Sequence, residues 1–372
     1  MVLNITELQV HQTASTVYET VSGKKNDYSN SQFALMMSCL CILSLFAVFG
    51  SVLQFLAVYL DRSLQNSSNI FILSLGCSDF IVGIWTLPTM AVSVYFRSWV
   101  LSDSVCQFSA FVDSLAITAS VWTLGFTALD RWMLVKSPIS YKSQMKQKKA
   151  VKIVGLIWFI SALAAAPPLL GWSGYDFSSY SLSCAMSSSG GFDSVHRYYF
   201  LFYVFLTFPA PIILIVISYS YIAWFVLGGG NSGRQVSIFN IRTAKITALL
   251  TAFVMGCILP TFIIGLIFWC GFQIPFSKAT SKIVIWGLLA NSGVNPLLYG
   301  WLNSQFRTVY KRMFWCLIVC KKYATLKRSA FSTQMMLTPT LRRSSAIRPV
   351  ENKQAASLFG WTEHFDKSHL HP

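Results

Sequence analysis

The sequence contains very little charge. Charged residues make up 11% of its 372 residues, compared with about 25% in a typical soluble domain, and the mean hydropathy is +0.54. This composition excludes an ordinary soluble domain and indicates a membrane protein. Acidic residues are the scarcest, with 13 Asp and Glu against 29 Lys and Arg, which gives a net charge of +16. We attribute this excess to contact with anionic membrane lipid and a cytosolic partner rather than with nucleic acid.

Several residue groupings that other protein classes need are also missing. The apolar stretches contain no His/Glu metal cluster and no nucleophile–base pair, so an enzyme is not expected. No internal repeat is present, which argues against the inverted-repeat design of many transporters. Nine scattered cysteines are too few for a disulfide scaffold. Residues 1–32 lack a cleavable signal pattern, so we expect the first apolar stretch to act as the signal anchor.

The sequence does contain seven long apolar stretches, each able to cross a bilayer as a helix of about 20 residues. They predict an all-α membrane protein, a seven-transmembrane helix bundle. The stretches cover residues 33–60, 69–95, 105–132, 150–171, 198–227, 243–269 and 281–301.

Lysine and arginine predict the orientation of this bundle. With residue 1 outside, the outer segments hold six Lys and Arg, the inner segments hold eleven, and the region from Arg307 onward holds twelve more. Because inner loops are enriched in basic residues, the N-terminus is predicted to be extracellular. The expected parts are an extracellular segment at 1–32, the bundle at 33–302, an amphipathic helix with juxtamembrane cysteines at 303–322, and a disordered cytoplasmic tail at 323–372.

The third apolar stretch, from Cys106 to Trp132, is predicted to organise the bundle. At ~1.5 Å per residue, Asp113 lies roughly 10 Å below Cys106, and Arg131 lies roughly 27 Å beyond Asp113. The second distance is close to the ~30 Å thickness of the hydrocarbon layer. Cys106, Asp113 and Arg131 therefore mark the outer end, the middle and the inner end of one membrane-crossing helix.

Two acids fall inside apolar stretches, where an ionisable group is costly and indicates function. Asp113 lies where a ligand can reach it from outside, so we expect it to attract a ligand ammonium, with cation–π contacts from Trp286, Phe262 and Tyr203. The alternative is a protonated Asp113 that hydrogen-bonds to Ser or Thr. Asp79 is expected either to hold a cation or to belong to a polar network between helices.

The adjacent pair Asp130 and Arg131 lies at the inner end of the third stretch. The acid can hold the guanidinium near the interface, and an arginine that moves from an internal partner to an incoming protein acts as a switch. The alternative is simple anchoring of the arginine at the interface. Prolines interrupt several stretches and predict hinges or static kinks, at Pro88, Pro167, Pro168, Pro211, Pro260 and Pro296.

Membrane attachment and modification sites are predicted at both ends of the chain. Asn4 begins a glycosylation sequon in the predicted extracellular segment. After the seventh stretch, apolar residues that include Phe306 and Tyr310 share one helical face, which predicts a short amphipathic eighth helix on the inner leaflet. Cys316 and Cys320 follow it and are candidate palmitoylation sites.

With these features in order, the chain resembles the class A, rhodopsin-like G-protein-coupled receptors across nearly all of residues 33–316. Each motif alone is weak, but the whole set in the right stretches is very specific. The set comprises LxxxD ending at Asp79, Cys106 with Cys184, DRW at Asp130–Trp132, Trp158, Pro211 with Tyr219, Pro260, NPLLY from Asn295 to Tyr299, and Phe306 with Arg307.

The resemblance implies roles for individual residues. It implies a disulfide between Cys106 and Cys184 that holds the outer loop over the third helix. It also implies a sodium pocket, a ligand site and a set of switch residues that face a heterotrimeric G protein, with arrestin as a further partner, at the plasma membrane. The sodium pocket would comprise Asp79, Ser120, Asn291 and Asn295; the ligand site Asp113, Tyr203, Thr207, Phe262 and Trp286; and the switch Asp130, Arg131, Tyr219, Pro260, Pro296 and Tyr299.

The subfamily indications are mixed. Asp113 occupies the position where amine receptors hold the ligand ammonium, whereas the outer loop before Cys184 is similar to that of opsins. Opsins carry the retinal lysine at the position of Leu289, and leucine cannot form a Schiff base. No retinal cofactor is therefore expected, and sodium is the one ion that the resemblance implies.

Three residues depart from the family pattern. Ser51 replaces the usual asparagine of the first span, Ile258 replaces a tryptophan, and Val254 replaces a phenylalanine. Those residues normally couple the ligand to helix motion, so weak, constitutive or differently gated signalling is expected.

The sequence thus favours a receptor for a small, cationic ligand that activates a G protein. An opsin-like receptor without the retinal lysine and a receptor-shaped scaffold that no longer signals are the alternatives. A transporter or channel with a cation path along Asp79 and Asp113 is the least supported.

Overall fold

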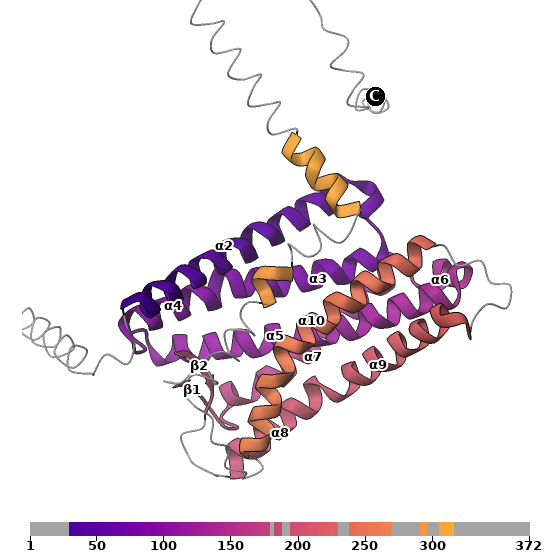
Figure 1. The fold of residues 1–372 in the computed structure, drawn as a ribbon. Coiled ribbons are helices and arrows are strands. Elements are labelled where there is room, and N and C mark those ends of the chain that lie inside the picture. Colours follow the sequence, from indigo (N-terminus) through magenta and orange to yellow (C-terminus); the bar gives the residue numbers. More distant parts are fainter. Residues whose placement is uncertain are drawn as a thin grey trace, which may run out of the picture. The chain divides into compact units, whose positions relative to one another are not determined.

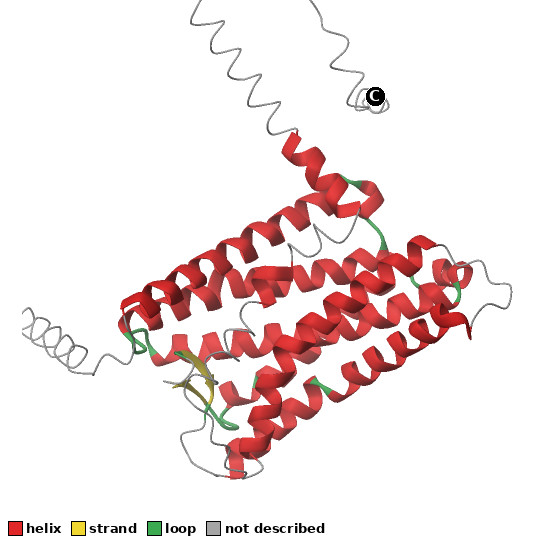
Figure 2. Ribbon diagram, viewed as in Figure 1, coloured by secondary structure: helices red, strands yellow, loops and turns green. Residues whose placement is uncertain are grey.

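The computed structural model describes residues 30–178, 182–187, 194–229, 238–269, 291–295 and 305–315. Apart from one short strand pair and its connecting loops, this part of the chain is helical (Figures 1 and 2). Residues 1–313 form one compact unit and residues 314–372 a second, of which only Phe314 and Trp315 are described.

The first three spans run from α2 to α5. Their elements are α2 (Asn30–Leu60), the 3₁₀ turn η1 (Arg62–Leu64), α3 (Ser67–Ile81), the π-helical turn η2 (Val82–Thr86), α4 (Leu87–Phe96) and α5 (Asp103–Lys136). Side-chain caps mark where the spans begin, because Asn66 accepts from the backbone N–H of Asn69 at 3.0 Å and Ser102 from that of Val105 at 3.4 Å.

The remaining elements complete the described bundle. They are α6 (Pro138–Gln144), α7 (Gln147–Ala165), η3 (Pro167–Leu170), β1 (Tyr175–Ser178), β2 (Ser183–Met186), α8 (Ser194–Thr207), α9 (Pro209–Trp224), the π-helical turn η4 (Phe225–Gly229) and α10 (Ile238–Trp269). Residues 291–295 and 305–315 are also helical. The helix α7 ends just before Pro167 and Pro168, as predicted, because proline cannot continue the hydrogen-bond ladder.

The length and apolarity of the helices agree with a membrane bundle. Among the described residues, five helices are long and apolar enough to cross a membrane, within 31–60, 67–96, 103–136, 195–227 and 241–267. The helix α7 is apolar after Lys152 and corresponds to the predicted fourth span. Of the seventh predicted span, only 291–295 are described.

The helix α5 lies at the centre of the described bundle, as its sequence predicted. It packs against α3, α7, α9 and α10 (Figure 1). Its small buried residues allow close approach: a Cβ added to Gly125 would lie 3.1 Å from the Cα of Pro211 in α9. The third and fifth spans are therefore in direct backbone contact.

The fifth span is broken between α8 and α9. Pro209 and Pro211 have no N–H, so two bonds of the helical ladder are missing there, and the regular helix is interrupted at Phe208. The indole N–H of Trp122 in α5 donates to the carbonyl of Leu206 at 3.2 Å. This bond connects the break to the central helix.

The second span contains a wide turn at Val82–Thr86. A π-helical turn holds one residue more than an α-helical turn and rotates the side chains that follow it. The hydroxyl of Ser44 in α2 donates to the carbonyl of Gly83 at 2.8 Å and so satisfies a backbone group within the turn.

Candidate functional site

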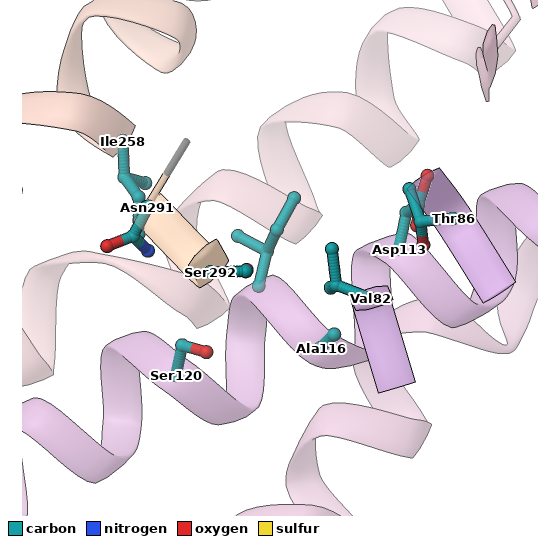
Figure 3. Close-up of a pocket in the computed structure, with 9 residues that line it drawn as sticks. Val82, Thr86, Asp113, Ala116, Ser120, Ile258, Asn291 and Ser292 are labelled. Atoms are coloured by element: carbon teal, nitrogen blue, oxygen red, sulfur yellow. The ribbon is translucent and has the colours of Figure 1, made fainter. Parts of the chain in front are cut away.

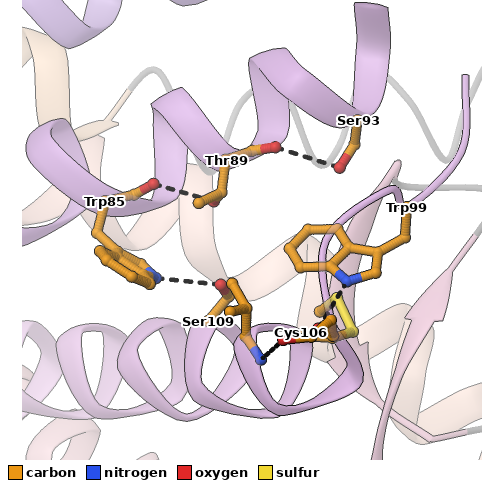
Figure 4. The surroundings of a disulfide bond; sticks show 9 residues. Trp85, Thr89, Ser93, Trp99, Cys106 and Ser109 are labelled. Carbon is orange, nitrogen blue, oxygen red and sulfur yellow. Dashed lines mark hydrogen bonds between the residues drawn. A yellow bond between two sulfur atoms is a disulfide. The ribbon is translucent and has the colours of Figure 1, made fainter. Parts of the chain in front are cut away.

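The outer end of α5 is tied to the strand pair. The predicted disulfide between Cys106 and Cys184 is present, and Cys184 lies opposite Phe177 in the antiparallel pair β1–β2. Trp99 packs beside this disulfide, and its indole N–H donates to the carbonyl of Ser102 at 3.1 Å (Figure 4). The hairpin is therefore held against the outer turns of α5.

Tyr175 anchors the hairpin to the helices below. Its hydroxyl donates to the carbonyl of Ala165 at 2.9 Å and lies 3.2 Å from the hydroxyl of Tyr199. Burial raises the pKa of Tyr175, so this hydroxyl stays protonated and remains a donor. The sequence did not single out Tyr175 as an anchor.

Asp113 receives a hydrogen bond from Thr86. The Thr86 hydroxyl donates to one carboxylate oxygen of Asp113 (Figure 3). Thr86 is the last residue of η2, so the wide turn determines which side chain of the second span faces α5. Within the described ranges, no salt bridge reaches Asp113.

A cavity of about 60 Å³ opens beside Asp113. It is polar at both ends and apolar between them (Figure 3). Its lining comes from the second, third and sixth spans and from the helical residues 291–295, and comprises Val82, Thr86, Asp113, Ala116, Ile117, Ser120, Ile258, Asn291 and Ser292.

Three other predicted ligand residues lie in a separate buried cluster. The Tyr203 hydroxyl donates to the carbonyl of Ser114 at 3.0 Å and accepts from Thr118 at 3.0 Å, while Thr118 and Thr207 lie 3.2 Å apart. Phe262 stacks on Tyr203 with ring centroids 6.1 Å apart. Tyr203, Thr207 and Phe262 do not line the cavity beside Asp113 in the described structure, so their ligand contact remains a prediction.

Two of the four predicted sodium residues, Asp79 and Asn295, are in direct contact, and all four are buried. The Asn295 amide donates to Asp79 at 3.3 Å, and Ser292 makes a further side-chain hydrogen bond to Asp79. Ser120 and Asn291 line the cavity instead. Among the described residues, the side-chain oxygens of Asn291 and Asn295 have no hydrogen-bond partner although both residues are buried.

The inner end of α5 holds a closed ionic cluster. Arg131 pairs with Asp130 at 3.1 Å, and both side chains are buried. Asp130 also accepts from the hydroxyl of Tyr141 at 2.6 Å and from that of Ser68 at 2.7 Å. The predicted contact between Asp130 and Arg131 is therefore present. The two hydroxyls that also bond to Asp130 come from α3 and α6.

The helix α6 was predicted only as a basic inner loop. Its Tyr141 hydroxyl lies 3.0 Å from the hydroxyls of both Ser67 and Ser68, and burial beside Asp130 raises the pKa of Tyr141 to about 12. Ile139 lies two residues before Tyr141 and is 91% exposed. A tyrosine within a basic loop after an Asp-Arg pair was the one available sequence signal, and it is a weak one.

Two other predicted switch residues, Tyr219 and Pro260, lie among the described residues. Tyr219 in α9 lies 3.3 Å, hydroxyl to hydroxyl, from Thr251 in α10. Pro260 lies inside α10, which continues through it without ending. Their roles in a switch remain predictions.

Several predicted sites lie outside the described residues. They are Asn4, Trp286, Leu289, Pro296, Tyr299, Cys316 and Cys320.

Comparison with known proteins gives a consistent family. The model of the 7 transmembrane receptor (rhodopsin family) matches residues 50–299. The human histamine H2 receptor is 30% identical over 285 residues, which cover 74% of this chain and 78% of the receptor. The zebrafish (Danio rerio) melatonin receptor type 1B-B is 23% identical over 316 residues, with 82% and 89% coverage. The squid rhodopsin crystal structure has the same fold, with a TM-score of 0.67, 20% identity, and coverage of 79% of this chain and 89% of that one.

Proposed function

Since this chain belongs to the rhodopsin family of seven-transmembrane receptors, we propose that it binds a small cationic ligand at Asp113 and activates a heterotrimeric G protein at its inner face. The proposal assigns the N-terminus to the outside, the bundle to 33–302 and the inner-leaflet helix to 303–322. Glycosylation at Asn4, palmitoylation at Cys316 and Cys320 and recruitment of arrestin belong to the same proposal.

The environment of Asp113 is the observation that carries the ligand class. The carboxylate lines a cavity, has a neutral donor in Thr86, and has no cationic partner in the described part of the chain. A buried carboxylate is costly without a countercharge, so a ligand ammonium would supply what the protein lacks. The similarity to an amine receptor, the histamine H2 receptor, supports the same class of ligand.

The inner face supports coupling to a G protein. The buried guanidinium of Arg131 would leave Asp130 and turn toward the incoming protein. Ile139 offers an exposed apolar side chain in α6, the helix whose Tyr141 bonds to Asp130. A contact that buries Ile139 would contribute about 1.5–3 kcal/mol. Arg131 and Ile139 therefore make separate, testable contributions to coupling.

The oxygens around Asp79 suit a hard monovalent cation. Asp79 would supply the charge. The neutral ligands would be the Ser120 hydroxyl and the side-chain oxygens of Asn291 and Asn295, which have no hydrogen-bond partner among the described residues. We propose that sodium at these residues stabilises the inactive receptor.

A direct test is G-protein activation in cells exposed to a panel of biogenic amines. Replacing Asp113 by Asn removes a charged contact worth about 1.5–3 kcal/mol, so potency should fall about 10- to 100-fold at unchanged surface expression. Arg131→Ala should abolish nucleotide exchange, and Ile139→Ala should weaken it without changing ligand affinity. Normal surface expression with unchanged exchange in Arg131→Ala would contradict the coupling proposal.

A receptor-shaped protein that no longer signals is the second candidate. It is favoured by Ile258 and Val254 in α10, both buried where the family usually has larger aromatic residues. Binding of an amine through Asp113 without any nucleotide exchange, together with recruitment of an inner partner, would favour this candidate.

A further inference from the structure

The wide turn Val82–Thr86 receives hydrogen bonds from residues outside it. A π-helical turn within an α-helix is rare and frequently marks a functional site. Pro88, two residues after the turn, has no N–H and so cannot extend the backbone ladder over it. The Thr89 hydroxyl donates instead to the carbonyl of Trp85 at 2.9 Å (Figure 4) and to that of Thr86 at 3.0 Å. These contacts satisfy the backbone of the turn but do not reach α5.

Trp85 joins this turn to α5. Its indole N–H donates to the hydroxyl of Ser109 at 3.0 Å (Figure 4), and its ring meets that of Phe108 edge to face with centroids 5.1 Å apart. Ser109 is 3% exposed, so water cannot readily replace this bond once it is lost. Trp85 is not among the described residues that line the cavity beside Asp113. An influence of Trp85 on a ligand in that cavity is therefore indirect.

The partners of Trp85 and Thr86 lie on one face of α5. Ser109 and Asp113 are four residues apart in that helix, so they are neighbours on its surface, ~6 Å apart along its axis. Within the described residues, the bond to Ser109 and the bond to Asp113 are the hydrogen bonds that the turn makes to α5. Trp85 and Thr86 are consecutive, so they move together when the turn rotates about its axis. The rotation that satisfies Trp85 therefore also points Thr86 at Asp113.

From this geometry we propose that Trp85 is a positioning residue of the ligand site. By bonding to Ser109, it holds the turn in the rotation in which the Thr86 hydroxyl donates to Asp113. Thr86 in turn orients the carboxylate that lines the cavity. This inference rests on the proposed ligand site at Asp113 and adds a residue that determines how the carboxylate is presented to a ligand. Loss of the Trp85 bond should weaken ligand binding without removing a ligand contact.

The first test needs no ligand. The Asp113 carboxyl band is measured by infrared spectroscopy on the purified, full-length receptor, isotope-labelled at the aspartate carboxyl carbons, and Asp113→Asn identifies the band. Thr86→Val, which replaces the hydroxyl by a methyl group, should shift this band because the carboxyl loses a hydrogen bond. Trp85→Phe, which keeps a ring but removes the indole donor, should shift the band in the same direction. Ser109→Ala removes the acceptor of the same bond and serves if Trp85→Phe does not fold.

The second test is amine potency in the G-protein assay, with the same panel of biogenic amines. Trp85→Phe should reduce the potency of the active amines about 3- to 10-fold, the equivalent of roughly one neutral hydrogen bond. The double variant Trp85→Phe/Thr86→Val should lose no more potency than Thr86→Val alone, because Trp85 acts through Thr86. If Trp85 only stabilised the fold, the two losses of potency would add.

Trp122→Phe is the matched control, because it also removes an indole bond between two spans, at 3.2 Å to the carbonyl of Leu206. It should lower stability and leave both the Asp113 band and the amine potency like those of the parent. A band that is unchanged in Trp85→Phe and Ser109→Ala, while Thr86→Val shifts it, would overturn the positioning role. Equal shifts of the band in Trp85→Phe and Trp122→Phe would do the same.

The positioning role and the proposed function fail in different ways. A panel without an active amine, with the band still shifted by Trp85→Phe, would overturn the amine ligand and support the positioning of Asp113 by Trp85. Amine potency that depends on Asp113 but not on Trp85, with an unchanged band in Trp85→Phe, would leave the proposed function intact and overturn the positioning role.

Discussion

The Tyr141 hydroxyl donates to the Asp130 carboxylate at 2.6 Å, and the same carboxylate pairs with Arg131 at 3.1 Å. Helix α6 therefore fixes the position of the Asp130 carboxylate, and this carboxylate in turn retains the guanidinium of Arg131. Ser68 completes the set from α3 at 2.7 Å. Three elements of the inner face thus meet at one buried carboxylate, and each donor there favours the state in which Arg131 is retained.

Replacing Tyr141 by Phe should raise basal G-protein activation. The change removes a hydrogen bond to a charged group, worth about 1.5–3 kcal/mol, and leaves the Asp130–Arg131 pair less well held. Basal nucleotide exchange in membranes should increase several-fold. Ser143→Ala, on the exposed side of the same helix, is the matched control and should behave like the parent. Equal basal exchange in Tyr141→Phe and the parent would argue against the retaining role.

The stabilising contribution of the same bond should change with pH only above about pH 10. The pKa of Tyr141 is raised from the ordinary value of 10 to about 12. Below about pH 10 tyrosine is protonated in both the folded and the unfolded state, so its contribution is fully present there. It is lost as the pH rises from about 10 toward 12. The unfolding temperature of the purified receptor should therefore fall more steeply between pH 10 and about pH 12 in the parent than in Tyr141→Phe. Equal slopes for the two proteins would contradict a raised pKa at Tyr141.

Adding one methyl group at Gly125 should destabilise the receptor. The new Cβ would lie 3.1 Å from the Pro211 backbone, which cannot move aside as a flexible side chain would. We expect Gly125→Ala to cost about 1–3 kcal/mol of unfolding free energy. Gly155→Ala is the matched control, because nothing lies within 4 Å of the added atom. That change should stabilise α7 by up to about 1 kcal/mol, because alanine favours the helix. Similar melting temperatures for the two variants would disprove close packing at Gly125.

Removing the donor that joins α5 to the break in the fifth span should also lower stability. Trp122→Phe keeps an aromatic ring but leaves the Leu206 carbonyl without its 3.2 Å bond. The expected loss is about 1 kcal/mol, read from thermal unfolding. Trp224→Phe, on an exposed surface of α9, should change stability by less than about 0.5 kcal/mol. A loss in Trp224→Phe as large as in Trp122→Phe would point to a general effect of removing tryptophan.

Sequence patterns predicted the spans well because lipid imposes a long apolar run on each of them. The α5 helix and the Asp130–Arg131 contact followed from residue type and spacing, and the Cys106–Cys184 disulfide followed from the family resemblance. Thr86 and Tyr141 did not follow, because threonine and tyrosine are common in spans and loops. Their importance comes from tertiary contacts, with Asp113 in one case and Asp130 in the other.

The predicted ligand wall shows the same limit. Tyr203, Thr207 and Phe262 were grouped with Asp113 by family position, but in the structure their hydroxyls and rings bond to each other and to α5. Hydrogen bonds inside that cluster compete with ligand contact, and no spacing in the sequence reveals such competition. Ile258 is the opposite case. The sequence showed that it replaces the usual tryptophan of the family, but only the structure showed that it lines the cavity beside Asp113.

The wide turn at Val82–Thr86 also changes how this receptor corresponds to its relatives. One extra residue in a turn advances every later position of the second span by about 100° around the helix axis. Position-by-position equivalence with a relative whose second span is α-helical throughout therefore holds up to Ile81 and is offset by one residue from Leu87 outward. A ligand-contacting position in the second span of such a relative therefore corresponds, within α4, to the adjacent residue of this chain.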